Sequence, residues 1–201
     1  MPHVEPILID LPDALIGGRV LVRPYQAGDG EALFEAVNAS LDHLKEWMPW
    51  SSKHTDPSAS ELVVRRAMAN WQLREDLTLS FWERETGRFL GGTGLHRIDW
   101  AVRRFEIGYW IRADAEGKGL VTETVRLVAG LAFGPLKANR VIIRCATTNH
   151  RSSAIPRRLG FRHEGVLFND GIRDDGSLYD IDLFSMVPEQ WLAMAESNSE
   201  G

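Results

Sequence analysis

The alternation of apolar and polar positions predicts that strands and helices follow one another along this chain. Helical spacing of apolar residues is clearest over 122–133, and Gly134-Pro135 ends that segment. The same reasoning predicts helices over 30–38, 41–47 and 58–73, and strands over 19–24, 78–83, 89–96, 105–111, 141–143 and 179–186. Strands that alternate with helices indicate an α/β domain with helices on both faces of a sheet.

The chain shows no repeat and no linker that would divide it. Pro-rich residues 1–16 predict an N-terminal arm, residues 17–190 a single domain, and residues 191–201, which end in the polar run 196–201, a frayed tail. Ser58 and Glu61 have the spacing of a capping box, which would begin the helix over 58–73.

The strand over 105–111 is followed by a glycine pair, Gly117 and Gly119, and then by the helix. Glycines between a strand and a helix let the backbone approach a ligand closely, and the start of the helix adds its positive end. This arrangement predicts a phosphate site. The spacing does not fit a Walker A loop, and Thr122 stands where the third glycine of a Rossmann turn would be.

A second motif follows about thirty residues later, with Asn149, Ser152, Ile155 and Arg158 spaced by three and then Leu159-Gly160-Phe161. Together the two motifs resemble the GNAT acetyltransferases, whose pyrophosphate loop reads Gln/Arg-x-x-Gly-x-Gly/Ala. Glu116 stands at the Gln/Arg position and Val121 at the last small position. The run from His43 to Trp50 and the sequence Gly-Lys-Gly-Leu-Val-Thr-Glu resemble the RimJ/RimL branch, the ribosomal-protein N-terminal acetyltransferases.

This resemblance implies a mixed α+β GNAT domain with a mostly antiparallel sheet of about seven strands, flanked by helices. The sheet would be splayed between the strand that ends at Ile111 and the strand at Val141. The implied function is transfer of an acetyl group from acetyl-CoA to a primary amine, preferably the N-terminal α-amine of a ribosomal protein. A small-molecule amine remains an alternative acceptor. The departures at Glu116 and Val121 also leave a non-catalytic acetyl-CoA-binding module open.

In the resembled family, backbone amides of 117–122 would hold the pyrophosphate, and backbone near Trp110 and Ile111 would pair with the pantetheine arm. Asn149 would bond the pantetheine amides, or serve only as a turn residue. Ser152 would contact the donor or protonate the departing sulfur, or only cap a helix that begins near Ser153. The donor-binding residues implied in this way are Trp110, Ile111, Glu116, Gly117, Lys118, Gly119, Leu120, Val121, Thr122, Asn149 and Ser152.

Glu106 is the candidate general base, because it lies in an otherwise apolar strand five residues before its end. The alternative is a glutamate that faces solvent. Tyr179 is a further candidate acid or a core tyrosine. Trp47 and Trp50 would line the acceptor cleft or belong to the core.

Net charge is −5, which implies no broad basic surface and argues against nucleic acid as a partner. The single cysteine, Cys145, fits a reducing cytoplasm and is expected to be buried rather than nucleophilic. No apolar run reaches the length of about 20 residues that spans a membrane. The histidines lack paired metal spacing, so no metal is expected. The branch resemblance adds a possible homodimer.

The free energy of deprotonating the acceptor favours an α-amine. An α-amine has a pKa of about 7.7–8.0, so roughly a tenth is neutral at pH 7. A lysine amine, at about 10.4, is neutral about four times in ten thousand, a gap of about 3.5 kcal/mol. One carboxylate base is therefore easier to reconcile with N-terminal acetylation than with lysine acetylation.

Overall fold

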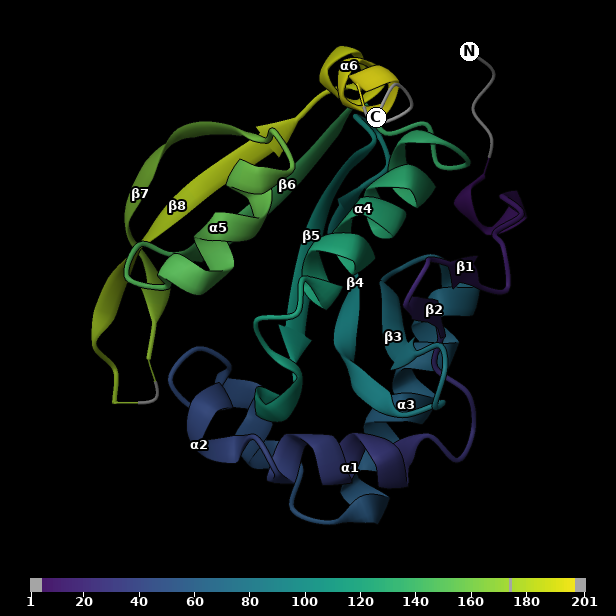
Figure 1. The fold of residues 1–201 in the computed structure, drawn as a ribbon, viewed down its shortest axis with the longest axis vertical. Helices are drawn as coiled ribbons and strands as arrows, with labels where there is room; N and C mark the ends of the chain where they lie inside the picture. The colour runs from purple at the N-terminus through teal and green to yellow at the C-terminus, as the bar shows by residue number, and fades with distance from the viewer. Residues whose placement is uncertain (1–4, 174, 198–201) are drawn as a thin grey trace.

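The structure is a computed structural model that describes residues 5–173 and 175–197. Its centre is one sheet of eight strands in the order β1-β2-β3-β4-β5-β6-β8-β7 (Figure 1). All neighbouring strands are antiparallel except β5 and β6, which are parallel. The strands are β1 (Leu15–Ile16), β2 (Val20–Pro24), β3 (Leu77–Glu83), β4 (Phe89–Asp99), β5 (Arg104–Ile111), β6 (Arg140–Ala146), β7 (Arg162–Ile172) and β8 (Leu178–Met186).

Helices cover both faces of this sheet, as the alternating pattern predicts. Helices α4 (Leu120–Phe133) and α5 (His150–Arg158) lie on one face, where Phe81, Phe105 and Val128 belong to the larger core (Figure 1). On the other face, α1 (Gly30–Asn38), α2 (Leu41–Leu44) and α3 (Pro57–Leu73) enclose a smaller apolar cluster around Val64 and Phe89. The remaining helices are α6 (Pro188–Ser197) and three single turns, η1 (Pro6–Leu8), η2 (Pro49–Lys53) and η3 (Ala113–Ala115).

The predicted splay of the sheet is confirmed, and its starting point is defined. Strands β5 and β6 pair only at Arg104 with Arg140, Phe105 with Val141, and Glu106 with Ile142. Beyond Glu106 the two strands separate, and Figure 1 shows them spreading apart away from α6. The backbone of β5 from Ile107 onward therefore has no partner on the side of β6.

The sheet has eight strands, where the family resemblance implies about seven. The sequence pattern predicts six of the eight and misses β1 and β7. Most of β7 is exposed on both faces, so its residues show no apolar alternation. Residues 5–16 of the predicted arm contain η1 and β1, and the boundary at residue 191 falls within α6. There Trp191 stacks on Phe133 with ring centroids 5.5 Å apart. Residues 1–4 of the predicted arm and 198–201 of the predicted tail lie outside the described residues.

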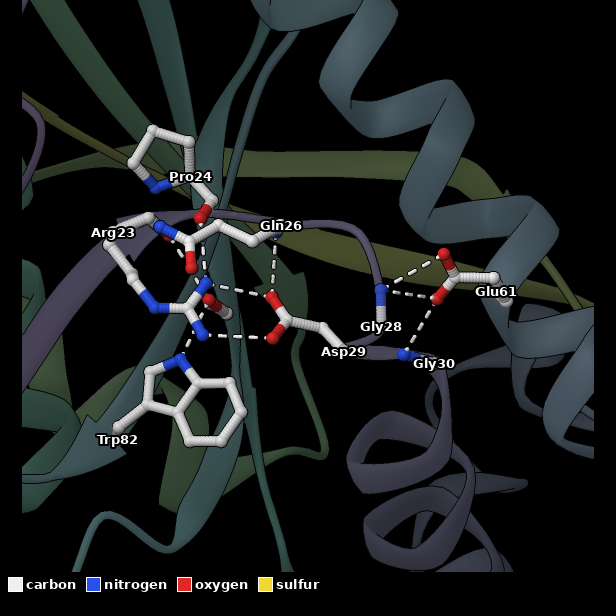
Figure 2. Close-up of polar contacts among 9 residues, drawn as sticks. Arg23, Pro24, Gln26, Gly28, Asp29, Gly30, Glu61 and Trp82 are labelled. Atoms are coloured by element: carbon white, nitrogen blue, oxygen red, sulfur yellow. Dashed lines mark hydrogen bonds and ion pairs between the residues drawn. The ribbon is translucent and has the colours of Figure 1, made fainter.

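The predicted capping box at Ser58 and Glu61 is wrong. Asp56 begins α3, and its side chain accepts a hydrogen bond of 2.8 Å from the backbone amide of Ala59. Glu61 instead accepts bonds of 3.0–3.1 Å from the amides of Gly28 and Gly30, in the loop that leads into α1 (Figure 2). A carboxylate on α3 thus satisfies backbone donors that are distant in sequence and ties α1 to α3.

A second polar contact fixes the same loop to the sheet. The Arg23 guanidinium donates two bonds, of 2.7 and 2.8 Å, to the Asp29 carboxylate and lies 4.5 Å from the ring centroid of Trp82 (Figure 2). Bidentate pairs of this kind restrict orientation strongly. The start of α1 is therefore held against β2 and β3.

In the part of the chain that the structure describes, no helix has both the length and the apolar character needed to cross a membrane.

Candidate active site

A cleft of about 920 Å³ opens where β5 leaves β6. Its walls are the end of β5, the loop into α4, the first turns of α5 and the segment after α2. Both predicted motifs line it, although they lie about thirty residues apart in the sequence. The residues concerned are Trp110, Ile111, Glu116, Gly117, Lys118, Gly119, Leu120, Val121, Thr122, Asn149 and Ser152.

The glycine pair has the backbone geometry that its position suggested. Gly117 and Gly119 have φ of 74° and 75°, a left-handed conformation that a side chain with a Cβ strains. Gly119 is the N-cap of α4, and no side chain among the described residues caps that end of the helix. The first amides of α4 therefore have no side-chain cap among the described residues, and a helix start of this kind favours an anion.

Basic side chains gather around this loop. A hollow of about 780 Å³ next to the cleft is lined by Arg19, Lys118, Arg126 and Arg158. Arg19 donates to the Lys118 carbonyl at 2.8 Å and to the Glu123 carboxylate at 3.0 Å, which fixes the loop to the start of β2. Sequence reasoning missed Arg19 and Arg126, since neither belongs to a motif. Arg158 belongs to the second motif, but the motif alone does not predict that it borders this hollow.

Glu116, the departure from the usual loop motif, bridges two elements across the cleft. Its carboxylate lies 2.6 Å from His43 Nε2, on α2, and 2.7 Å from Arg151 Nη1, on α5. All three residues line the cleft. The Glu116 carboxylate thus links the α2 side of the cleft to the α5 side.

A chain of hydroxyl groups crosses the splay. The Tyr109 hydroxyl, on β5, donates to the Ser152 carbonyl at 2.9 Å, and the Ser152 hydroxyl donates to the Tyr109 oxygen at 3.2 Å. Burial raises the pKa of Tyr109, so its hydroxyl keeps its proton at neutral pH. Sequence reasoning considered Tyr179 instead, which lies on β8 beside Arg173 and does not line this cleft.

Asn149, rather than Ser152, caps α5. Its side-chain oxygen accepts a 3.0 Å bond from the Ser152 amide, so the alternative in which Ser152 is only a cap is wrong. Cys145 is buried next to these residues, as expected, and burial raises the pKa of its thiol to about 11. A thiol with that pKa is a poor nucleophile at neutral pH.

Glu106 lies on the opposite face of the sheet from Tyr109 and does not line the cleft. Successive side chains of a strand alternate between faces, so Glu106 shares the face of Gly108 and Trp110. Arg97 Nη1 pairs with its Oε1 at 2.5 Å, and Arg144 Nη1 lies 4.0 Å from its Oε2. The residue is 9% exposed, so the alternative of a solvent-facing glutamate is wrong, and Oε2 has no hydrogen-bond partner among the described residues.

The two tryptophans occupy different places. Trp47 lines the cleft beside Met48. Trp50 does not line it but packs edge-on against Trp110, with ring centroids 5.6 Å apart, and it contacts His54 in the same way. Trp50 therefore lies on the face of the sheet that carries Glu106. Among the described residues, no three His, Cys, Asp or Glu side chains are grouped so that they could hold a metal ion.

Residues 19–162 match the acetyltransferase (GNAT) domain family. YdaF of Bacillus subtilis strain 168, a candidate ribosomal N-acetyltransferase, is 30% identical over 179 residues, which are 88% of this chain and 95% of that protein. The ribosomal-protein-serine acetyltransferase of Escherichia coli K12 is 28% identical over 152 residues, or 73% of this chain and 83% of that protein.

Two solved structures share the fold. The microcin C7 self-immunity acetyltransferase MccE, solved with acetyl-CoA and AMP, is 26% identical with a TM-score of 0.79 and covers 85% of this chain and 93% of its own. The ribosomal α-N-protein acetyltransferase RimL, solved with coenzyme A, is 17% identical with a TM-score of 0.82 and covers 88% and 99%. The similarity to RimL, at 17% identity, therefore supports the fold alone. The similarity to MccE, at 26% identity, also supports a closer relationship between that protein and this chain.

Proposed function

This chain belongs to the GNAT acetyltransferase family and is an acyltransferase that uses acetyl-CoA, and we propose that its acceptor is the α-amine at the N-terminus of a protein. A ribosomal protein is the first candidate. The alternative of a non-catalytic binding module is wrong, because relatives that share nearly the whole domain are acetyltransferases.

The observation that carries this proposal is similarity along most of the chain to acetyltransferases named for ribosomal proteins. The small free-energy cost of deprotonating an α-amine supports it, as do the aromatic side chains of Trp47, which lines the cleft with Trp110, and of Trp50, which packs against Trp110. The relationship to MccE keeps a small-molecule amine as the second candidate acceptor.

The residues of the cleft fit the acetyl donor. The left-handed glycines and the uncapped start of α4 suit a diphosphate, and Arg19, Arg126 and Arg158 supply positive charge beside it. The unpaired part of β5 at Trp110 and Ile111 is proposed to pair with the amide groups of the pantetheine arm, with Asn149 facing it from α5. No metal is needed for this chemistry.

The donor supplies an activated acyl group on a good leaving sulfur, and the protein positions and polarises it. We assign the oxyanion contact to a backbone N–H near Ile111. Ser152 and Tyr109 are proposed to donate a proton to the departing sulfur, since both residues line the cleft and their hydroxyls are hydrogen-bonded to each other. Glu106 remains a catalytic candidate. Its Oε2 accepts no hydrogen bond among the described residues and lies 4.0 Å from Arg144 Nη1, and it is proposed to attract the acceptor ammonium on the other face of the sheet.

Asn149→Ala is expected to weaken acetyl-CoA binding more than Ser152→Ala weakens turnover. The Asn149→Ala variant loses the proposed contact with acetyl-CoA and also the cap of α5. Loss of a helix cap costs about 0.5–2 kcal/mol. Ser152 shares proton donation with Tyr109, so one hydroxyl remains. Calorimetry gives the Kd of Asn149→Ala for acetyl-CoA, and steady-state kinetics give the kcat of Ser152→Ala. The two fold-changes are then compared. Equal and negligible effects of both substitutions would show that this segment is structural only.

Trp50→Ala is expected to raise the peptide KM several-fold without changing acetyl-CoA affinity, because Trp50 packs against Trp110 but does not line the cleft proposed for the donor. A purely structural role predicts instead a large fall in Tm, since truncating a core tryptophan costs about 3–5 kcal/mol. Trp191→Ala is the matched control, because Trp191 stacks on Phe133 far from the acceptor face. A destabilised Trp50→Ala protein with a normal peptide KM would contradict the acceptor role.

A competition assay tests the proposed acceptor class. Wild-type protein is incubated with acetyl-CoA and a panel of short peptides with free N-termini, together with small primary amines such as spermidine and tyramine. We expect the highest kcat/KM for a peptide α-amine. A higher value for a small amine would replace the first candidate by the second.

The cellular location and the oligomeric state are also proposals. We place the enzyme in the cytoplasm, where a ribosomal acceptor would be found, and expect a homodimer from the branch that the sequence resembles. Light scattering of the purified protein over a concentration series tests the second property.

A further inference from the structure

His96 lies on the acceptor face of the sheet, directly opposite Glu106 in the pairing of β4 with β5. Its ring covers two glycines that also pair with each other, Gly94 and Gly108. A Cβ at Gly94 would come within 2.9 Å of His96 Nε2, and one at Gly108 within 3.3 Å. The imidazole therefore occupies space that only glycine leaves free, at a residue pair that lies two beyond the last pairing of β5 with β6.

Asp76 fixes the orientation and the tautomer of this imidazole. His96 Nδ1 lies 3.0 and 2.9 Å from the two carboxylate oxygens of Asp76, and Thr78 donates a further hydrogen bond to Asp76. A carboxylate only accepts, so Nδ1 carries the proton and Nε2 presents a lone pair when the ring is neutral. The side chain of His96 is 30% exposed, which leaves it within reach of a ligand.

The ring of His96 lies against Gly108 of β5, two residues past the last pair that β5 forms with β6. The donor cleft lies on the face of α4 and α5, and its acyl end is expected where the free edge of β5 begins, near Gly108. An amine that approaches from the opposite face meets His96, Glu106 and Trp110 before it reaches that edge. A histidine oriented by a carboxylate beside the path of a nucleophile is the arrangement of a general base.

We propose that His96 is the general base that deprotonates the acceptor amine, and that Asp76 is its positioning residue. This inference rests on the proposed function only in requiring a primary amine as acceptor, whether peptide or small molecule. Glu106 is the less suitable proton acceptor, because Arg97 already occupies one of its oxygens and Arg144 faces the other. We therefore assign proton removal to the imidazole and attraction of the ammonium to the carboxylate.

The protons and electrons balance in this assignment. His96 Nε2 takes one proton from the acceptor ammonium and passes it to water. The lone pair of the neutral amine then forms the nitrogen–carbon bond, the carbon–sulfur bond breaks, and its electron pair stays on sulfur. The second amine proton passes to His96 and on to water, while the sulfur takes a proton from the Tyr109 and Ser152 hydroxyls, which water replenishes. One proton is released in total.

His96→Gln is expected to lower kcat by about 10²–10⁴-fold at pH 7 with unchanged acetyl-CoA Kd. Its residual kcat/KM should rise with pH as the acceptor itself loses its proton, so the deficit shrinks in alkali. The charged groups that face the ring and shape this profile are Asp76 from the loop before β3 and Glu106 from β5, with Arg97 and Arg144 behind Glu106. Added imidazole should partly restore His96→Ala, which a structural role would not allow.

His163→Gln is the matched control. His163 Nε2 also pairs with a carboxylate, Asp182 at 2.7 Å, but it lies on β7, which β6 and β8 separate from β5. Its kcat and pH profile should equal those of the wild type. A His96→Gln protein with wild-type kcat, or one whose deficit is constant with pH and insensitive to imidazole, would overturn the proposal.

A second measurement does not depend on the acceptor. Imidazole ¹H–¹⁵N NMR spectra of the wild type should show His96 as the Nδ1–H tautomer, and Asp76→Asn should disturb that tautomer. An Nε2–H tautomer in the wild type would overturn the assignment. If the wild type acetylates none of the peptides or small amines, the proposed function fails instead, which the tautomer measurement distinguishes from a failure at His96.

Discussion

Gly119→Val is expected to give a folded protein that binds acetyl-CoA about 100-fold more weakly or worse. Gly119 has a φ of 75° and caps α4, so a β-branched residue there either strains the backbone or turns the amides away from the anion site. A 100-fold loss corresponds to about 2.8 kcal/mol at 1.4 kcal/mol per tenfold. Isothermal titration calorimetry with acetyl-CoA measures the change directly.

Gly87→Val separates this effect from backbone strain alone. Gly87 also has a left-handed φ, of 68°, and open space around a built Cβ, but it lies in the turn between β3 and β4, away from the cleft. Both variants should lose similar stability on thermal unfolding, and only Gly119→Val should lose affinity. Wild-type acetyl-CoA affinity in folded Gly119→Val would refute the assignment of the loop.

Glu106→Gln is expected to lower kcat/KM for the amine by about 30- to 5,000-fold. The substitution keeps the shape of the side chain but leaves Arg97 without its carboxylate partner, while Arg144 keeps its ion pair with Asp170. Removing one partner from a buried charge pair costs about 2–5 kcal/mol, which is the origin of this range, and the 64% exposure of Arg97 favours its lower end. The loss should appear mainly in KM and shrink at high pH, where more of the acceptor is neutral.

Glu164→Gln is the control for the loss of an arginine-paired carboxylate. Arg140 and the Ser185 hydroxyl hold the pKa of Glu164 down to about 2, and Glu164 lies on β7, outside the cleft. Its substitution should affect stability but not the amine KM. A Glu106→Gln protein with the wild-type KM and pH profile would remove Glu106 from the acceptor site.

The donor side of the site could be predicted from the sequence because its determinants are local. Gly117 and Gly119 mark a loop by themselves, and the fixed spacing from Asn149 to Phe161 marks a capped helix. The strand before the loop and the helix after it follow from apolar periodicity. The family resemblance then added the splay between β5 and β6, which the pairing at Glu106 and Ile142 confirms.

The acceptor side depends on contacts that no local pattern reveals. His96 reaches Asp76 across twenty residues, and its place over Gly94 and Gly108 follows from the register of β4 with β5. The capping box failed for the same reason, since the carboxylate of Glu61 is bound by amides more than thirty residues earlier. Strand β7 was missed because an exposed strand has no apolar face to show.

The central claim is that this acetyl-CoA-dependent enzyme acts on an α-amine at a protein N-terminus. Its most direct test uses two peptides of one sequence that contains a single lysine, one with a free N-terminal serine and one with that amine blocked. After incubation with wild-type protein and acetyl-CoA, fragment mass spectra locate any added acetyl group. The account predicts acetylation at the serine α-amine of the first peptide and none on the second. Acetylation of the lysine in the blocked peptide, at a rate similar to the acetylation of the peptide with a free N-terminus, would contradict this prediction.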